Sequence, residues 1–176
     1  AATGELLGDG GSATEADIDA AVAAARAALP GWASSSPDHR AGVLKAFAAA
    51  LHQRARDTSE LVTRENGMPI SLSGAANGLF PAGLLSYYAK LIATVPTEEV
   101  RPSATGHTVV RREPVGVVAA IVPWNYPQAL AAFKFAPALA AGCTVVLKAS
   151  PETALDALVF AEAAQEAGVP PGVLNV

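Results

Sequence analysis

The chain has 176 residues, of which 51% are hydrophobic and 6% aromatic, and its formal net charge is −4. This length and apolar content suit one domain with an aliphatic core, with or without an appendage. The acidic balance argues against binding to nucleic acid or anionic membranes, and the single cysteine excludes an internal disulfide and fits a reducing compartment.

Residues 1–13 are glycine-rich and predict a loop. They lack the basic and apolar regions of a signal peptide, and no apolar run in the sequence reaches the length of a transmembrane helix. We therefore expect a cytoplasmic protein that does not bind membranes.

The first half of the chain predicts helices. Thr14 is a suitable N-cap for a helix over 14–29, which the sequence PGWASSSP is expected to end. A second helix is predicted over 38–65, with Gly67 as the residue that terminates it. A third is predicted over 72–92, bent or split by the proline inside it.

The pattern changes between the helical half and the end of the chain. Residues 94–106, TVPTEEVRPSATG, carry prolines and charges and predict a linker or a strand edge. Residues 107–122, HTVVRREPVGVVAAIV, are rich in valine but interrupted by a Glu-Pro pair. They predict either two short strands or one bent arm.

From Val117 onward, strands and helices are predicted to alternate. The runs VVAAIV and CTVVLK are typical of strands buried on both faces, and VLNV predicts a third strand. One helix is predicted over 128–141. Another is predicted to start at Ser150 as N-cap, with Pro151 in the first helical position, and to reach Ala167. This βαβαβ order predicts a parallel sheet with right-handed crossovers.

The turn PWNYP, residues 123–127, follows the first of these strands. Ligands of open α/β sheets bind at the carboxyl ends of the strands, so this turn is a candidate site. Asn125 has two interpretations. Its side chain either caps the following helix or donates its amide to a ligand oxygen.

Two lysines and the only cysteine are further candidates. Lys148 ends the second strand beside a helix N-terminus, where a cation suits an anion or a sugar hydroxyl; the alternative is a solvated surface lysine. Lys134 stands between two phenylalanines, and its stem is expected to pack. Cys143 begins its strand at the opposite end and is expected to be a buried apolar residue.

Two common signatures are missing from the sequence. There is no G-x-G-x-x-G motif, so the usual dinucleotide fingerprint is absent. The three histidines are far apart and have no ligand-like partners, so we expect no metal site.

Several segments resemble, in the expected order, segments of the aldehyde dehydrogenase superfamily. Residues 121–176, which begin IVPWNYPQALAAFKFAPALAAGCTVVLKASPETALD, resemble the start of the coenzyme-binding domain. Upstream segments are resembled by ATGELLG, DIDAAVAAARAALPGW, RENGMP and VVRREPVGVV. The resemblance implies an α/β fold: N-terminal helices, a β arm for oligomerisation and the first βαβαβ of a Rossmann-like parallel sheet. It assigns residues 1–96 to the helical part, 97–116 to the arm and 117–176 to the sheet, and implies that the catalytic domain is absent.

The resemblance also implies roles for individual residues. Asn125 corresponds to the asparagine whose amide forms half of an oxyanion hole, and losing one such donor costs about 3 kcal/mol. Lys148 corresponds to the lysine that binds the adenosine ribose of NAD or NADP. Lys134 corresponds to a family lysine near the active site and coenzyme. The implied cofactor-binding residues are Ile121, Val122, Pro123, Trp124, Lys148, Ser150 and Pro151, with Glu152 as a further candidate.

The chain departs from the family pattern in two places. Many members have a carboxylate three residues after the ribose lysine, where this chain has Pro151, and its acid is Glu152. We hypothesise that Ser150 or the helix N-terminus binds a 2′-phosphate instead, so that NADP is tolerated or preferred. The family's catalytic cysteine and general-base glutamate lie far downstream, and Cys143 is not in the nucleophile's position. We therefore expect the isolated chain to be inactive.

The leading functional prediction is NAD(P)-dependent oxidation of a small-molecule aldehyde to a carboxylate, through a thiohemiacetal and a thioester, by a complete enzyme. The arm at residues 107–118 is expected to build a homo-oligomer, a dimer or a tetramer. Two alternatives stay open. One is a truncated, inactive binding or assembly module of the same fold, and the other is a reductive acyl-phosphate or acyl-CoA relative.

Overall fold

The computed structural model describes residues 3–176, in which helices dominate the first half and alternate with strands in the second. The helices are α1 (Glu15–Ala33), α2 (Pro37–Gln53), α3 (Ala55–Asn66), α4 (Ile70–Ser73), α5 (Phe80–Leu91), α6 (Pro127–Ala141) and α7 (Leu155–Glu166). The strands are β1 (Glu98–Ser103), β2 (Gly106–Arg111), β3 (Val117–Ile121), β4 (Thr144–Lys148) and β5 (Leu174–Asn175).

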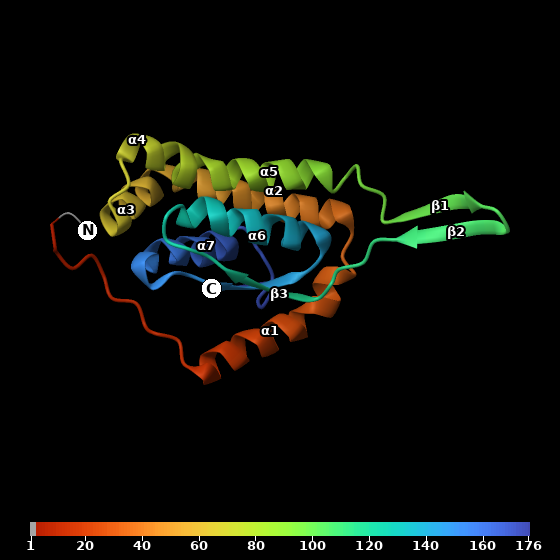
Figure 1. The fold of residues 1–176 in the computed structure, drawn as a ribbon, viewed down its shortest axis with the longest axis horizontal. Helices are drawn as coiled ribbons and strands as arrows, with labels where there is room; N and C mark the ends of the chain where they lie inside the picture. Colours follow the sequence, from red (N-terminus) through yellow and green to blue (C-terminus); the bar gives the residue numbers. More distant parts are fainter. Residues whose placement is uncertain (1–2) are drawn as a thin grey trace.

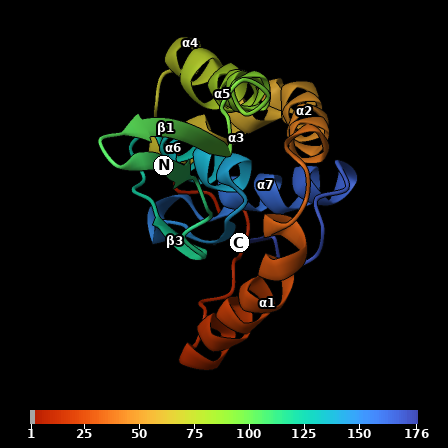
Figure 2. The ribbon, with the colours of Figure 1, turned by 90° about the vertical axis from the view of Figure 1, so that its right-hand side faces the viewer.

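The strands β3, β4 and β5 form a parallel sheet in that order, as the βαβαβ pattern predicts. Helices α6 and α7 cover one face of the sheet and α1 covers the other (Figures 1 and 2). Helices α2 and α5 form a further layer outside α6. The α/β fold expected from the sequence is confirmed.

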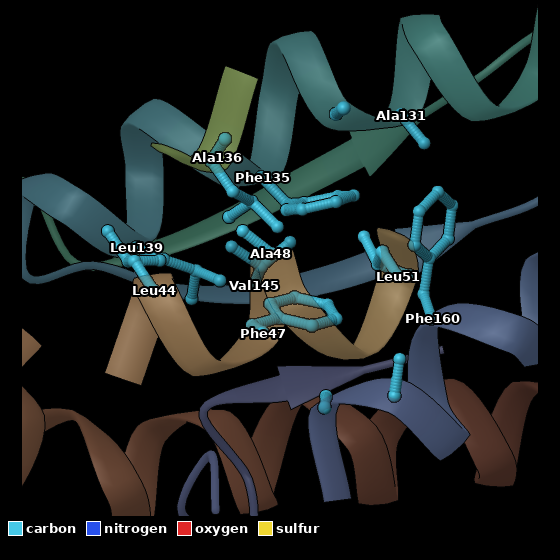
Figure 3. Packing of buried hydrophobic residues seen from close by; sticks show 14 of the residues in the cluster. Leu44, Phe47, Ala48, Leu51, Ala131, Phe135, Ala136, Leu139, Val145 and Phe160 are labelled. Atoms are coloured by element: carbon cyan, nitrogen blue, oxygen red, sulfur yellow. The ribbon is translucent and has the colours of Figure 1, made fainter. Parts of the chain in front are cut away.

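One cluster of buried apolar residues joins the N-terminal helices to the sheet. Phe135 of α6 is fully buried; its ring centroid lies 5.7 Å from that of Phe47 of α2 and 4.8 Å from that of Phe160 of α7 (Figure 3). Val145 of β4 is fully buried in the same cluster. The helices before residue 96 therefore share their core with the sheet and orient it.

The first helix is longer than predicted. It does not end before Pro30 but continues to Ala33. Trp32 is buried, and its indole Nε1 donates a hydrogen bond to the Leu139 carbonyl at 3.1 Å. This contact holds the last turn of α1 against α6, so tertiary packing outweighs the helix-breaking tendency of Pro30. The N-terminal prediction is confirmed, because Thr14 forms a capping box with Asp17.

The prediction of one continuous helix over 38–65 is corrected, whereas the expected interruption of the third helix is found close to its proline. The helix predicted over 38–65 is divided at Arg54, whose guanidinium donates to the Ala50 carbonyl and to the Glu166 carboxylate. The helix predicted over 72–92 is split as expected: a π-helical turn, Gly74–Leu79, directly precedes α5, whose first turn carries Pro81. Gly67 ends α3 with a φ of 79°, as predicted.

Residues 94–106, predicted as a linker or a strand edge, contain a strand, β1. β1 pairs antiparallel with β2, and this hairpin projects from the body of the molecule (Figure 1). Residues 107–122 therefore form two strands, β2 and β3, rather than one bent arm. Ion pairs tie the hairpin together: Arg111 to Glu98 at 2.9 Å and Arg112 to Glu99 at 2.6 Å.

Candidate functional site

The carboxyl ends of β3 and β4 lie side by side and bring the predicted cofactor residues together. Ile121 is the register partner of Lys148, and the Val122 amide donates to the Lys148 carbonyl at 3.2 Å. Ile121 and Lys148 are exposed, whereas the Val122 side chain is buried. The edge therefore offers a ligand the lysine side chain and the turn that follows β3.

Asn125 lies in the exposed turn between β3 and α6. The N-cap of α6 is Tyr126, which makes no side-chain capping bond. The Asn125 side chain makes no hydrogen bond to the residues from 3 to 176. The helix-capping interpretation is wrong, and the amide is available to a ligand. Pro123 and Trp124 are exposed in the same turn.

The turn after β4 differs from the sequence prediction. Pro151–Thr153 is a 3-10 turn, and α7 begins only at Leu155, so Ser150 makes no side-chain cap. The Ser150 hydroxyl instead donates to the Glu152 carboxylate. This hydrogen bond and, to a smaller degree, the charge of Lys148 hold the pKa of Glu152 below its usual value. Glu152 therefore lies within electrostatic reach of Lys148.

The N-terminus of α7 is capped by a residue from another helix. The Glu65 carboxylate, at the end of α3, accepts hydrogen bonds from the amides of Leu155 at 2.9 Å and Asp156 at 3.1 Å. Half-burial raises the pKa of Glu65, and these two amides partly offset that effect. The backbone amides predicted to bind a 2′-phosphate are thus already occupied.

The next residue along α3 holds the other turn of the site. The Asn66 Nδ2 donates to the Trp124 carbonyl at 2.9 Å, and the Asn66 Oδ1 accepts from the Met68 amide at 2.9 Å. Trp124 directly precedes Asn125. Asn66 thereby fixes the backbone next to the candidate oxyanion donor.

A second carboxyl group lies beneath this edge, out of contact with solvent. Asp156 is 1% exposed, and its Oδ2 accepts from the Gln128 Nε2 at 2.7 Å, while its Oδ1 has no hydrogen-bond partner among residues 3–176. Burial, with a further contribution from the negative charge of Glu65, raises the pKa of Asp156 to about 7.

Two sequence candidates lie away from this edge. Cys143 is buried and immediately precedes β4, at the end opposite Lys148, as predicted. Lys134 is exposed on α6 and follows Phe133, whose ring centroid lies 5.1 Å from that of Phe80. No hydrogen bond or ion pair joins Lys134 to another described residue.

Residues 3–176 contain no group of three or more His, Cys, Asp or Glu side chains that is suitable for a metal ion. None of their helices combines the length and hydrophobicity needed to cross a bilayer.

Glu65 and Asn66 were not identified from the sequence as site residues. One signal was available. A carboxylate in the last turn of a helix is unfavourable next to the negative end of the helix dipole. Glu65 in α3 is such a residue, which indicates that it has a partner elsewhere in the fold.

Comparisons with known proteins match the whole chain. The aldehyde dehydrogenase family model matches residues 1–176. Geranial dehydrogenase of Castellaniella defragrans is 51% identical over 178 residues, which cover 99% of this chain and 37% of the relative.

Solved structures of aldehyde dehydrogenases are also similar to the chain. An aldehyde dehydrogenase from Brucella melitensis biovar abortus 2308 has a TM-score of 0.94 and 36% identity, over 98% of this chain and 36% of that one. Aldehyde dehydrogenase C from Pseudomonas syringae, a mutant solved with NAD+ and octanal, has a TM-score of 0.85 and 42% identity, over 90% of this chain and 32% of that one. The chain thus spans about a third of the length of these relatives.

Proposed function

The chain belongs to the aldehyde dehydrogenase family, and from this premise we propose that it supplies an oxyanion donor and part of a cofactor site for the NAD(P)-dependent oxidation of an aldehyde to a carboxylate. The observation that carries the proposal is the shared edge of β3 and β4, where an unengaged Asn125 amide and an exposed Lys148 lie on adjacent turns. The relative solved with NAD+ and octanal supports this class of cofactor and substrate.

Asn125 serves as the oxyanion donor in this proposal. Addition of a thiolate to an aldehyde carbon places negative charge on the carbonyl oxygen, and a fixed amide donor stabilises that charge without reorganising. The exposed, unpaired side chain of Asn125 and the bond from Asn66 to the preceding carbonyl support this role.

Lys148 binds the adenosine ribose of the cofactor. The exposed edge beyond Ile121, Pro123 and Trp124 suits a flat dinucleotide, and a lysine there can donate to the ribose hydroxyls. The bound NAD(P)+ would accept the hydride from the substrate. Lys134 is exposed on α6 and stays a candidate for a structural role near the cofactor.

We propose NAD+ rather than NADP+ as the preferred cofactor. The Ser150 hydroxyl is engaged with Glu152, and the amides at the start of α7 are engaged with Glu65, so both groups that would bind a 2′-phosphate have partners. The Glu152 carboxylate also repels a phosphate and can accept from ribose hydroxyls. Titration with both cofactors tests this preference, and tighter binding of NADP+ would contradict it.

The 176 residues are inactive by themselves in this proposal. Their only cysteine, Cys143, is 3% exposed and lies at the wrong end of β4, so it cannot serve as the nucleophile. We propose that this chain works within a complete aldehyde dehydrogenase that adds the nucleophile and the general base. Turnover of an aldehyde with NAD+ by the isolated chain would refute this assignment.

The test of the Asn125 role uses the complete enzyme. Asn125→Ala is expected to lower kcat by about 10²–10³-fold, because one oxyanion donor is lost. Cofactor affinity should change little. Gln53→Ala removes an exposed amide at the end of α2 and serves as the control. Equal kcat values for wild type and Asn125→Ala would exclude the proposed role.

We also propose that the protein is a cytoplasmic homo-oligomer, a dimer or a tetramer, formed through the hairpin and the segment after it. Three valines of this region are exposed, Val100 by 62%, Val109 by 54% and Val115 by 90%. Such exposure of apolar side chains supports a second copy of the chain that buries them. Sedimentation velocity tests the assembly. Self-association without any cofactor binding would favour the assembly-module alternative.

A further inference from the structure

Consecutive residues at the end of α3 contact both turns of the proposed site. Glu65 accepts from the first amides of α7, in the segment that follows Lys148. Asn66 donates to the Trp124 carbonyl, in the turn that carries Asn125. The two turns belong to different strands, and α3 is separated from both in sequence.

The Glu65 carboxylate provides the hydrogen-bond acceptor that the N-terminus of α7 lacks in its own sequence. The N-cap residue of α7 is Ala154, which has no side-chain acceptor, so the first helical amides depend on another part of the chain. An ionised carboxylate can accept from both amides and interacts favourably with the positive end of the helix dipole. Glu65 therefore anchors the end of the turn that begins at Lys148.

The bonds of Asn66 use both ends of its amide. Its Oδ1 is held by the Met68 amide, which turns back because Gly67 adopts a left-handed conformation with φ of 79°. Its Nδ2 is thereby aimed at the Trp124 carbonyl. An aspartate at this position would keep the acceptor for Met68 but would have no donor for Trp124.

We propose that Glu65 and Asn66 are positioning residues that set the separation of the Asn125 turn and the Lys148 turn. Neither residue is expected to touch the substrate or cofactor. The expected effect of the two residues on cofactor binding rests on the proposed function, whereas their expected effect on the two turns rests on hydrogen-bond geometry alone.

Two variants with matched controls test this inference. Glu65→Gln keeps the shape of the side chain but removes its charge and one acceptor. Its control is Glu60→Gln, the same change on an exposed face of α3. Asn66→Asp removes the donor to Trp124, and its control is Gln53→Glu, which adds the same charge at an exposed site.

The expected results separate positioning from general stability. Glu65→Gln should raise the exchange rate of the Leu155 or Asp156 amide about tenfold by NMR, because a lost acceptor frees the amide to open. Asn66→Asp should shift the side-chain amide signals of Asn125. Both variants should weaken NAD+ binding by about tenfold, measured well below their melting temperatures, and both controls should leave it unchanged.

The outcomes that overturn the inference are specific. If the variants melt at lower temperature but bind NAD+ as tightly as wild type, the two residues only stabilise the fold. If the wild-type chain does not bind NAD+ at all, the proposed cofactor site is wrong. The amide exchange and the Asn125 signals then decide whether the two residues position the turns, and unchanged values would refute it.

Discussion

The buried carboxyl group of Asp156 makes the stability of the protein depend on pH. Its pKa is raised from 3.8 to about 7 in the folded state, chiefly by burial. The folded protein therefore holds this proton more tightly than the unfolded chain. The resulting contribution to stability is fully present below pH 4 and is lost as the pH rises through 7. A rise of this size corresponds to roughly 4 kcal/mol, since each pKa unit is worth about 1.4 kcal/mol.

The substitution Asp156→Asn removes this dependence. The asparagine stays neutral at every pH and keeps an oxygen for the Gln128 amide, and the atom that replaces Oδ1 occupies a position without a hydrogen-bond partner in residues 3–176. At pH 5 the variant should already be more stable by about 1–2 kcal/mol, because the carboxyl group is ionised in the unfolded chain but still protonated in the folded protein. At pH 8 the variant should be more stable by about 2–4 kcal/mol, a range that allows for partial solvation of the ionised group.

Urea denaturation followed by circular dichroism at pH 5, 6, 7 and 8 measures this difference. Asp9→Asn, a substitution of an exposed carboxyl in the N-terminal segment, is the control and should follow the wild type. The reasoning fails if the difference in the free energy of unfolding between Asp156→Asn and wild type does not grow as the pH rises.

Two further predictions concern the core and the link between α6 and β4. Phe135→Ala should lower the free energy of unfolding by about 3–5 kcal/mol, because this fully buried ring packs between Phe47 and Phe160. Urea denaturation at pH 6 measures this loss, and a loss below about 1 kcal/mol would contradict the packing described. Gly142→Ala should lower the free energy of unfolding by at least about 1–2 kcal/mol, because Gly142 has a φ of 91° and an added Cβ would lie 2.9 Å from Pro114. An unchanged melting temperature would contradict this prediction.

The sequence predicted the parallel sheet, and the proximity of the two turns at its edge, for a physical reason. Strands buried on both faces are continuous apolar runs, and the runs before Pro123 and after Cys143 are unambiguous. Because parallel strands end at one edge, the proximity of the Asn125 turn to Lys148 follows from the βαβ order alone.

The polar contacts that organise this edge could not be predicted in the same way. Glu65 caps α7 from a distance of 90 residues, and local pattern rules assigned that role to Ser150. The division at Arg54 and the continuation of α1 past Pro30 likewise depend on contacts with α7 and α6. Such long-range partners leave no periodicity in the sequence.

The central claim is that the edge formed by β3 and β4 binds a nicotinamide dinucleotide through Lys148. Calorimetric titration of the 176-residue chain with NAD+ tests it most directly, with Lys148→Ala as the variant and Lys90→Ala, an exposed lysine on α5, as the control. Saturable binding that Lys148→Ala weakens by about tenfold and Lys90→Ala leaves unchanged is the predicted result, since tenfold is the loss of about one charged hydrogen bond. Saturable binding that is equally tight in wild type and Lys148→Ala, or no binding by the wild-type chain, would contradict the account.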